Sequence, residues 1–136
     1  MLLWLCTLLF AARVAGQALQ FVLPQPWLPR FDAFQGSKLP YWALFSAQLA
    51  ILALMLRVSY RAGSGKLRAN PRLGKALTWA GSVYFAGSIL RIVVGLAVSE
   101  APEWFRAWMP ASLHVVLASF VLVLAACYRG DRGEVE

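Results

Sequence analysis

Five polar side chains lie within long apolar stretches of this 136-residue sequence: Arg13, Gln17, Gln48, Arg91 and His114. Arginine and glutamine carry N–H donors that suit carbonyl, carboxylate or phosphate oxygens. Arg13 and Gln17 are four residues apart, so they share one face if this stretch is helical. The residue types therefore indicate a site that could bind the oxygen atoms of a small molecule.

Other kinds of chemistry have less support. His114 is the only histidine, so a bis-histidine haem would need a second chain, and a zinc site has no other ligands nearby in the sequence. Ser112 and Ser119 have no nearby carboxylate that could orient His114 for nucleophilic catalysis. Cys6 and Cys127 form no CxxC motif. We expect no metal, no cofactor and no catalytic constellation, and the sequence offers no ground for assigning an enzyme.

The apolar stretches themselves predict the fold class. Hydrophobic residues make up 60% of the chain and charged residues 14%, whereas soluble domains are typically about 45–50% apolar and about 25% charged. A helix needs about 20 apolar residues to cross a bilayer. We therefore predict one all-α domain over residues 1–136, a polytopic membrane protein folded as a four-transmembrane-helix bundle. The predicted spans are residues 2–23, 40–56, 76–98 and 111–128.

The basic segment 57–75 predicts the orientation. It contains six of the 13 lysine and arginine residues and no acidic residue. Short basic loops stay in the cytoplasm, so we expect this loop, both termini and the tail 129–136 to be cytoplasmic in a bacterial inner membrane. This distribution accounts for the net charge of +7 without a nucleic-acid partner, and attraction to anionic lipids is a plausible addition. Gly63–Lys66 does not match a phosphate-binding loop, because leucine follows the lysine.

The first apolar stretch has two interpretations. It is long enough for a retained span that ends at Pro24. Alternatively, residues 2–12 form the apolar region of a signal peptide, with a cleavage site near Gly16. No lysine or arginine precedes the stretch, which favours the retained span.

The depth of the polar residues suggests a common cavity. In the predicted topology, Gln17, Gln20, Gln48 and Arg91 lie in the outer halves of their helices, and His114 is one turn below the outer surface. They could therefore line one cavity that opens outward. No Asp or Glu lies within a predicted span, so the buried arginines either bind an anion or reach the acidic residues of the outer connectors, Asp32, Glu100 and Glu103. In a third interpretation, Arg91 extends to the outer surface and Arg13 bonds to Gln17 and helix carbonyls.

Small and aromatic residues predict how the helices pack. Gly81, Ser88 and Gly95 recur every seven residues, and such stripes let helix backbones approach closely in a bilayer. We therefore expect 76–98 to be the centre of the bundle. Aromatic residues in the two outer connectors predict interfacial segments. One has Trp27, Phe31 and Phe34 at headgroup level, and the other forms a short amphipathic helix over 99–110.

The segment RVAGQALQF, which starts at Arg13, together with the four-span plan resembles the small DoxX-type four-helix membrane proteins. This resemblance implies a subunit or accessory protein of a quinone-linked redox system. The segment GSKLPYWALFSAQLAILALM is also similar to uncharacterised bacterial four-span proteins, a resemblance that implies no activity.

Two functions follow as hypotheses. In the first, the protein is an accessory or scaffold subunit that packs against a larger membrane protein or against itself, because helix-packing residues are abundant and catalytic groups are lacking. In the second, it binds or carries a lipophilic anion, lipid or quinone in the outer-leaflet cavity. Both hypotheses make the lipid bilayer its immediate environment.

Overall fold

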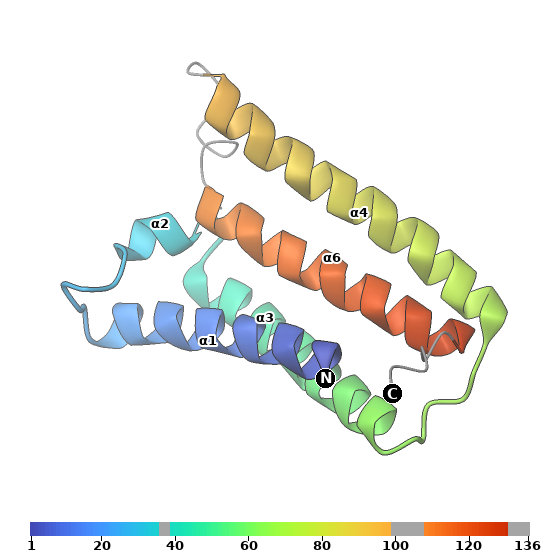
Figure 1. Cartoon of the computed structure of the whole chain (residues 1–136). Helices are drawn as coiled ribbons and strands as arrows, with labels where there is room; N and C mark the ends of the chain where they lie inside the picture. Colours follow the sequence, from blue (N-terminus) through green and yellow to red (C-terminus); the bar gives the residue numbers. More distant parts are fainter. Residues whose placement is uncertain (36–38, 99–107, 131–136) are drawn as a thin grey trace.

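A computed structural model describes residues 1–35, 39–98 and 108–130, without the side chains of Asp32, Gln35 and Trp108. These residues form helices and connectors and contain no β-strand. The helices are α1 (Leu2–Val22), α2 (Phe31–Gln35), α3 (Tyr41–Gly63), α4 (Pro71–Ala97) and α6 (Trp108–Arg129) (Figure 1). The predicted all-α bundle is confirmed.

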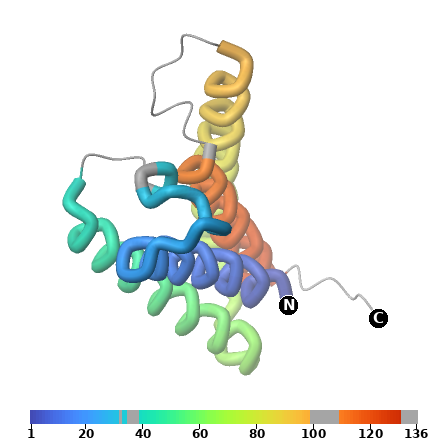
Figure 2. Tube along the Cα trace, turned by 90° about the vertical axis from the view of Figure 1, so that its left-hand side faces the viewer, coloured from blue at the N-terminus to red at the C-terminus, as the bar shows by residue number. Residues whose placement is uncertain are grey.

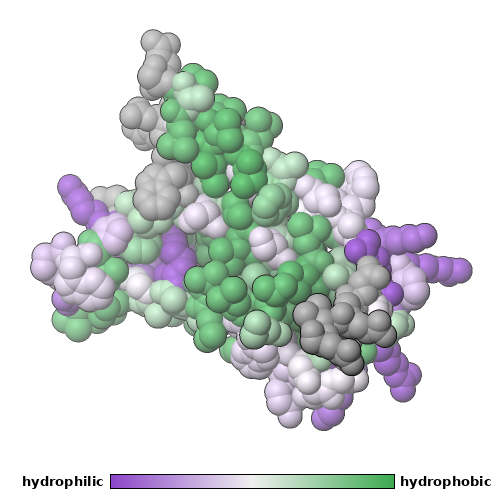
Figure 3. Space-filling view, in the orientation of Figure 1, coloured by the Kyte–Doolittle hydropathy of each residue, from purple (hydrophilic) through white to green (hydrophobic). Residues whose placement is uncertain are grey.

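The four long helices, α1, α3, α4 and α6, are each long and apolar enough to cross a membrane. The chain is therefore a multi-pass membrane protein, as the sequence predicts. Apolar side chains cover the middle of the molecule, and extended hydrophilic side chains gather at the end where α4 begins (Figure 3). In a bilayer the apolar surface contacts lipid, which explains why large side chains such as Trp79 and Leu90 are exposed.

The helices pack in the order α3, α1, α6, α4. The inner helix α1 contacts α3 and α6, and α6 also contacts α4 and the short α2. Figure 1 shows α6 between α1 and α4, and Figure 2 shows α3 on the far side of α1. The prediction that 76–98 is the centre of the bundle is wrong, because α4 packs mainly on α6 at the edge.

Helix α6 can occupy the centre because it has no polar face. Every residue from 109 to 128 is buried or half-buried. Small residues are interspersed with branched ones along the helix, and Ala118 and Ala125 are fully buried. Leu, Val and Ala on all sides allow packing on two opposite faces.

The N-terminal helix is part of the core. Its buried residues Leu3, Phe10 and Val14 form one cluster with Met55 of α3 and Phe120 of α6. Near the same end of α1, Thr7 Oγ1 lies 3.0 Å from Ser59 Oγ of α3, a hydrogen bond between two buried hydroxyl groups. The first predicted span is therefore helix α1, and it packs on α3 and α6.

Both described ends of the chain lie at the basic connector (Figure 1). A Cβ at Gly63 would be 3.7 Å from Trp4 Nε1 near the start of α1. The Asn70 amide at the start of α4 donates to the Tyr128 carbonyl near the end of α6, at 2.9 Å. The helices therefore alternate in direction, as a four-span topology requires.

Two helices extend beyond the predicted spans into the predicted basic loop. Helix α3 continues through Arg57 and Arg61 to Gly63, and α4 begins at Pro71 rather than at residue 76. The sequence prediction ended each span where the charges begin, but charged residues continue a helix readily. The connector between α3 and α4 is therefore only residues 64–70.

Local sequence explains the ends of this connector. Gly65 has φ +70°, and the Gly65 and Lys66 amides donate to the carbonyls of Ala62 and Arg61. This is a Schellman motif, which requires a residue in the left-handed region. At the other end, Asn70 Oδ1 accepts from Leu73 N at 3.1 Å and caps α4.

The first outer connector differs from its prediction. Trp27 is exposed, as expected for an interfacial residue, but Phe34 is only 6% exposed. Phe31 lies 5.4 Å from Phe21 and 5.1 Å from Tyr41, measured between ring centroids. The short helix α2 thus folds over the ends of α1 and α3 because its aromatic rings pack there. Most of the predicted amphipathic helix 99–110 lies outside the described residues.

Candidate polar cavity between the four helices

The five predicted site residues meet at one place in the bundle. Four of them line a cavity of about 320 Å³; they are Arg13 of α1, Gln48 of α3, Arg91 of α4 and His114 of α6. The fifth, Gln17, is completely buried next to Arg13 and Gln48. Each long helix therefore contributes a polar side chain to one cavity.

Arg13 is held by neutral partners. Its Nη1 donates to Gln17 Oε1 at 2.6 Å, and its Nη2 donates to the Phe34 carbonyl at 2.7 Å. Its guanidinium carbon also lies 4.7 Å from the centroid of the Phe34 ring, within the range of a cation–π contact. These contacts include the Gln17 and helix-carbonyl bonds of the third interpretation, and they fix the guanidinium without neutralising its charge.

Gln17 connects Arg13 to Gln48. Its Oε1 accepts from Arg13 Nη1 and also from Gln48 Nε2, the latter at 3.2 Å. Gln48 is 4% exposed, so its amide is almost as deeply buried as that of Gln17. One oxygen atom therefore organises polar groups from two helices.

Among the residues that the structure describes, three polar atoms of this network have no hydrogen-bond partner: Arg13 Nε, Gln17 Nε2 and Gln48 Oε1. They are two donors and one acceptor, and all three are buried. An unsatisfied polar group in a bilayer costs several kcal/mol. A hydrogen-bond network with unpartnered donors and acceptors beside a cavity is therefore suited to a ligand that supplies the missing hydrogen-bond partners.

On the other side of the cavity, His114 is paired with a tyrosine. Its Nδ1 lies 2.6 Å from Tyr84 Oη, so α4 and α6 share a short hydrogen bond. A second cavity of about 450 Å³, which opens between these helices, is also lined by Arg91, His114 and Tyr84. Arg91 and His114 therefore border both cavities.

The rest of the cavity wall is apolar. Aromatic, aliphatic and proline side chains surround the polar groups: Phe10, Phe34, Leu39, Leu44, Ile51, Pro110, Leu113 and Leu117. Binding sites for small molecules commonly combine such walls with a few convergent polar groups. The volume is at the lower end of the usual range of about 300–1,000 Å³.

Sequence reasoning missed two residues of the site. The Phe34 contacts have no sequence signal, because any residue could supply the carbonyl. Tyr84 shares a helix face with Ser88 and Arg91 by its i, i+4, i+7 spacing, but this spacing alone does not predict its hydrogen bond to His114. Gln20, on the face of Arg13 and Gln17, instead accepts a hydrogen bond from the Gln25 amide at 2.9 Å and holds the connector.

The predicted acidic partners of the arginines fall outside this description. Glu100 and Glu103 are among the residues that are not described, and the same holds for the side chain of Asp32. The neutral contacts of Arg13 are therefore the ones that the structure establishes for it.

The described residues contain no group of three or more His, Cys, Asp or Glu side chains that could hold a metal. Ser112 and Ser119 donate to the carbonyls of Met109 and Val115 in their own helix, each at 2.8 Å. Both hydroxyls therefore bond to carbonyl groups of α6, and the partner that the structure gives His114 Nδ1 is Tyr84 Oη.

The predicted packing residues lie along α4. Gly81 is buried against Leu122 and Val121 of α6. Ser88 is 6% exposed, and Gly95, one heptad further, is half-buried. Gly74, one heptad before Gly81, is also buried on α6 and extends the stripe beyond the predicted residues.

The polar cavity combines three chemical features. Its residue types provide hydrogen-bond donors and a positive charge, its walls are apolar, and it lies among helices that cross a membrane. Searches against protein-family models, curated proteins and solved structures found no match to this chain.

Proposed function

We propose that this protein binds a lipophilic molecule with an oxygen-bearing head group, such as a quinone or an anionic lipid, in the polar cavity. The observation that carries the proposal is the set of three buried, unpartnered polar atoms on Arg13, Gln17 and Gln48. Gln48 and Arg13 line a cavity with apolar walls, which would take the apolar part of such a molecule.

The arrangement of donors and acceptors narrows the ligand chemistry. Arg13 Nε and Gln17 Nε2 can donate to a carbonyl, carboxylate or phosphate oxygen. Gln48 Oε1 can accept from a hydroxyl group, so a molecule that carries both a hydroxyl and an acceptor oxygen, such as a quinol, suits the two residues that line the cavity, Arg13 and Gln48. The spans contain arginines but no Asp or Glu, which favours an electron-rich or anionic head group. The resemblance to DoxX-type proteins agrees with a quinone and remains a prediction.

The binding prediction can be tested by comparing two substitutions on α3. Gln48→Leu removes an acceptor and a donor from the cavity, whereas Ser46→Ala removes an exposed hydroxyl bonded only to its own helix at Trp42. We expect lipophilic molecules that co-purify with the wild type in mild detergent to be retained by Ser46→Ala and lost by Gln48→Leu. Binding of an added short-chain ubiquinone should weaken about tenfold, the cost of about one lost hydrogen bond.

Circular dichroism checks that Gln48→Leu keeps its helices. Mass spectrometry of solvent extracts identifies what is bound. Equal retention of every extracted molecule by both variants, with unchanged binding of the ubiquinone, would refute the polar cavity as the site.

The localisation is part of the proposal. In a bacterial inner membrane with the basic connector and both termini in the cytoplasm, the polar cavity would face the outer leaflet. The positive-inside rule supports this orientation, since the connector 64–70 and its flanking helical turns carry six cations.

Labelling tests the orientation. Starting from a variant in which Cys6 and Cys127 are alanine, we expect a cysteine at the exposed position Ser64 to react with a membrane-impermeant maleimide only after the inner membrane is opened. A cysteine at Pro29, in the opposite connector, should react in cells whose outer membrane alone is permeable. The reverse pattern would invert the proposed topology.

An accessory or scaffold subunit is the second candidate. The observation that favours it is the packing order, because α3 and α4 each have one principal helix neighbour and leave apolar faces uncovered. Lipid could cover such faces equally well, so the molecular mass of the protein in mild detergent must be measured to distinguish a complex from a monomer. We would expect a complex larger than the monomer to survive in mild detergent. Its recovery from both the wild type and Gln48→Leu would support this function over ligand binding.

A further inference from the structure

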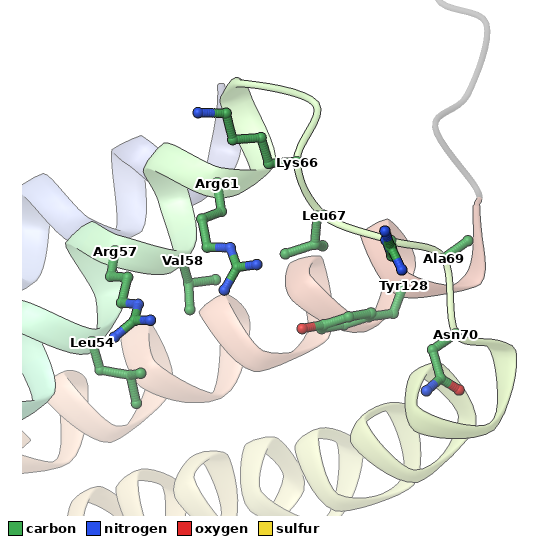
Figure 4. A pocket seen from close by; sticks show the side chains of 10 residues that line it. Leu54, Arg57, Val58, Arg61, Lys66, Leu67, Ala69, Asn70 and Tyr128 are labelled. Carbon is green, nitrogen blue, oxygen red and sulfur yellow. The ribbon is translucent and has the colours of Figure 1, made fainter.

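A second cavity lies at the basic end of the helices. It has a volume of about 600 Å³ and shares no lining residue with the polar cavity. Its walls come from α3, the connector 64–70 and the end of α6 (Figure 4). The lining residues are Leu54, Arg57, Val58, Arg61, Lys66, Leu67, Arg68, Ala69, Asn70 and Tyr128.

Positive charge is concentrated in this basic pocket. Four of its lining residues are cations, and the sequence has no Asp or Glu between residues 33 and 99. Arg57 and Arg61 are four residues apart on α3, where two like charges disfavour each other. Figure 4 shows both guanidinium groups and the Tyr128 ring directed into the space between α3 and α6. An anion bound there would relieve this repulsion and accept hydrogen bonds from the three groups.

The deepest residue of the pocket on α3 is apolar. Arg61 and Arg57 lie two and six residues from the end of α3 at Gly63, whereas Leu54 lies nine residues from it, or about 13 Å at 1.5 Å per residue. Leu54 therefore lines the part of the pocket nearer the middle of the membrane, and Val58 lies beside Arg57 along the helix. This order matches that of a phospholipid, with an anionic head group at the surface and acyl chains below it.

The pocket is open for a structural reason. Helix α3 packs chiefly on α1, and no extensive packing joins it to α4 or α6. The connector is nevertheless fixed, because Lys66 N donates to the Arg61 carbonyl and Asn70 N to the Tyr128 carbonyl. The Gly65 and Lys66 amides are engaged in the helix cap, so an anion would be bound by side chains rather than by a phosphate-binding loop.

We propose that the basic pocket binds the phosphate group of an anionic phospholipid from the leaflet on the connector side. Arg57, Arg61 and Tyr128 hold the phosphate, and the acyl chains lie along Leu54 and Val58. This site is independent of the proposed function, because it shares no residue with the polar cavity.

Two charge-matched pairs of substitutions test the site. Arg57→Gln/Arg61→Gln removes two pocket charges, whereas Arg72→Gln/Lys75→Gln removes two exposed charges of α4 that do not line the pocket. Binding of phosphatidylglycerol, phosphatidylcholine and glycerol 3-phosphate to the purified protein is measured by native mass spectrometry. We expect the wild type to bind phosphatidylglycerol at least about tenfold more tightly than phosphatidylcholine.

In Arg57→Gln/Arg61→Gln this preference should disappear, and in Arg72→Gln/Lys75→Gln it should remain within about twofold of the wild type. An equal loss in both pairs would show general charge attraction and overturn the site. Displacement of the lipid by equal concentrations of glycerol 3-phosphate would indicate a site for soluble phosphates instead. The lipid preference of the wild type tests the proposal without any variant, since equal binding of the two lipids refutes it.

Discussion

Replacing Gln17 with leucine is expected to lower the free energy of unfolding by about 2–4 kcal/mol, because one buried oxygen serves two donors. Gln17 Oε1 accepts from Arg13 Nη1 at 2.6 Å and from Gln48 Nε2 at 3.2 Å. Leucine has a similar size but no acceptor, so the variant keeps the packing and leaves a buried charge with fewer partners. The measurement is reversible unfolding in mixed micelles, followed by circular dichroism.

A second substitution distinguishes lost hydrogen bonding from poor packing. Arg13→Leu removes the charge that Gln17 stabilises and also removes the cost of an arginine at bilayer depth, about 2.5–3.5 kcal/mol on insertion scales. We therefore expect Arg13→Leu/Gln17→Leu to be more stable than Gln17→Leu alone. Two residues in one network should show this non-additivity, and additive destabilisation would contradict the interpretation of Gln17 as the shared acceptor.

The same network explains which parts of the site are visible in the sequence. Polar residues in apolar stretches are conspicuous, and their depth along four spans suggests that Gln17, Gln48, Arg91 and His114 lie in the same leaflet. The hydrogen bonds between them depend on how the helices are rotated and paired, which spacing along one helix does not specify. The Phe34 carbonyl that binds Arg13 is a backbone group, so no residue type could have predicted it.

For the fold too, the sequence predicts some features and not others. Hydropathy predicts the four spans, because length and apolar composition decide whether a helix crosses the bilayer. It does not predict which helix is central, since lipid and protein are equally apolar surroundings for Leu and Val. The stripe of small residues on α4, Gly81, Ser88 and Gly95, predicts one close helix–helix contact, and the structure shows that this contact is with α6. A central helix would need such close contacts with more than one neighbouring helix.

The predicted start of the third span, at residue 76, leaves one helix-packing residue outside the span. Because the charges of segment 57–75 predict a loop, the sequence does not predict Gly74 as a helix-packing residue. In the structure it is the first member of the stripe Gly74, Gly81, Ser88 and Gly95. Charge marks where a helix leaves the membrane, whereas the helix itself continues for one or two further turns.

The residue most sensitive to size is expected to be Gly74. A Cβ at this position would lie 3.1 Å from the Ala125 carbonyl oxygen and 3.1 Å from the Arg129 amide nitrogen, both backbone atoms of α6. Backbone atoms cannot move aside singly, so α4 must separate from α6, the helix on which it mainly packs within the described residues. We expect Gly74→Ala to lower the free energy of unfolding by about 1–3 kcal/mol, the usual cost of overpacking.

Two other glycines provide graded controls for Gly74→Ala. At Gly81 the nearest atoms belong to the side chains of Leu122 and Val121, which can adjust, so Gly81→Ala should cost less. At Gly16 of α1 a Cβ would meet nothing within 4 Å, and Gly16→Ala should be neutral or stabilising by up to about 1 kcal/mol through helix propensity. Thermal unfolding in mild detergent should therefore rank the variants Gly16→Ala, Gly81→Ala and Gly74→Ala in falling stability. If Gly74→Ala were as stable as Gly16→Ala, α4 and α6 would not approach each other as closely as the structure shows.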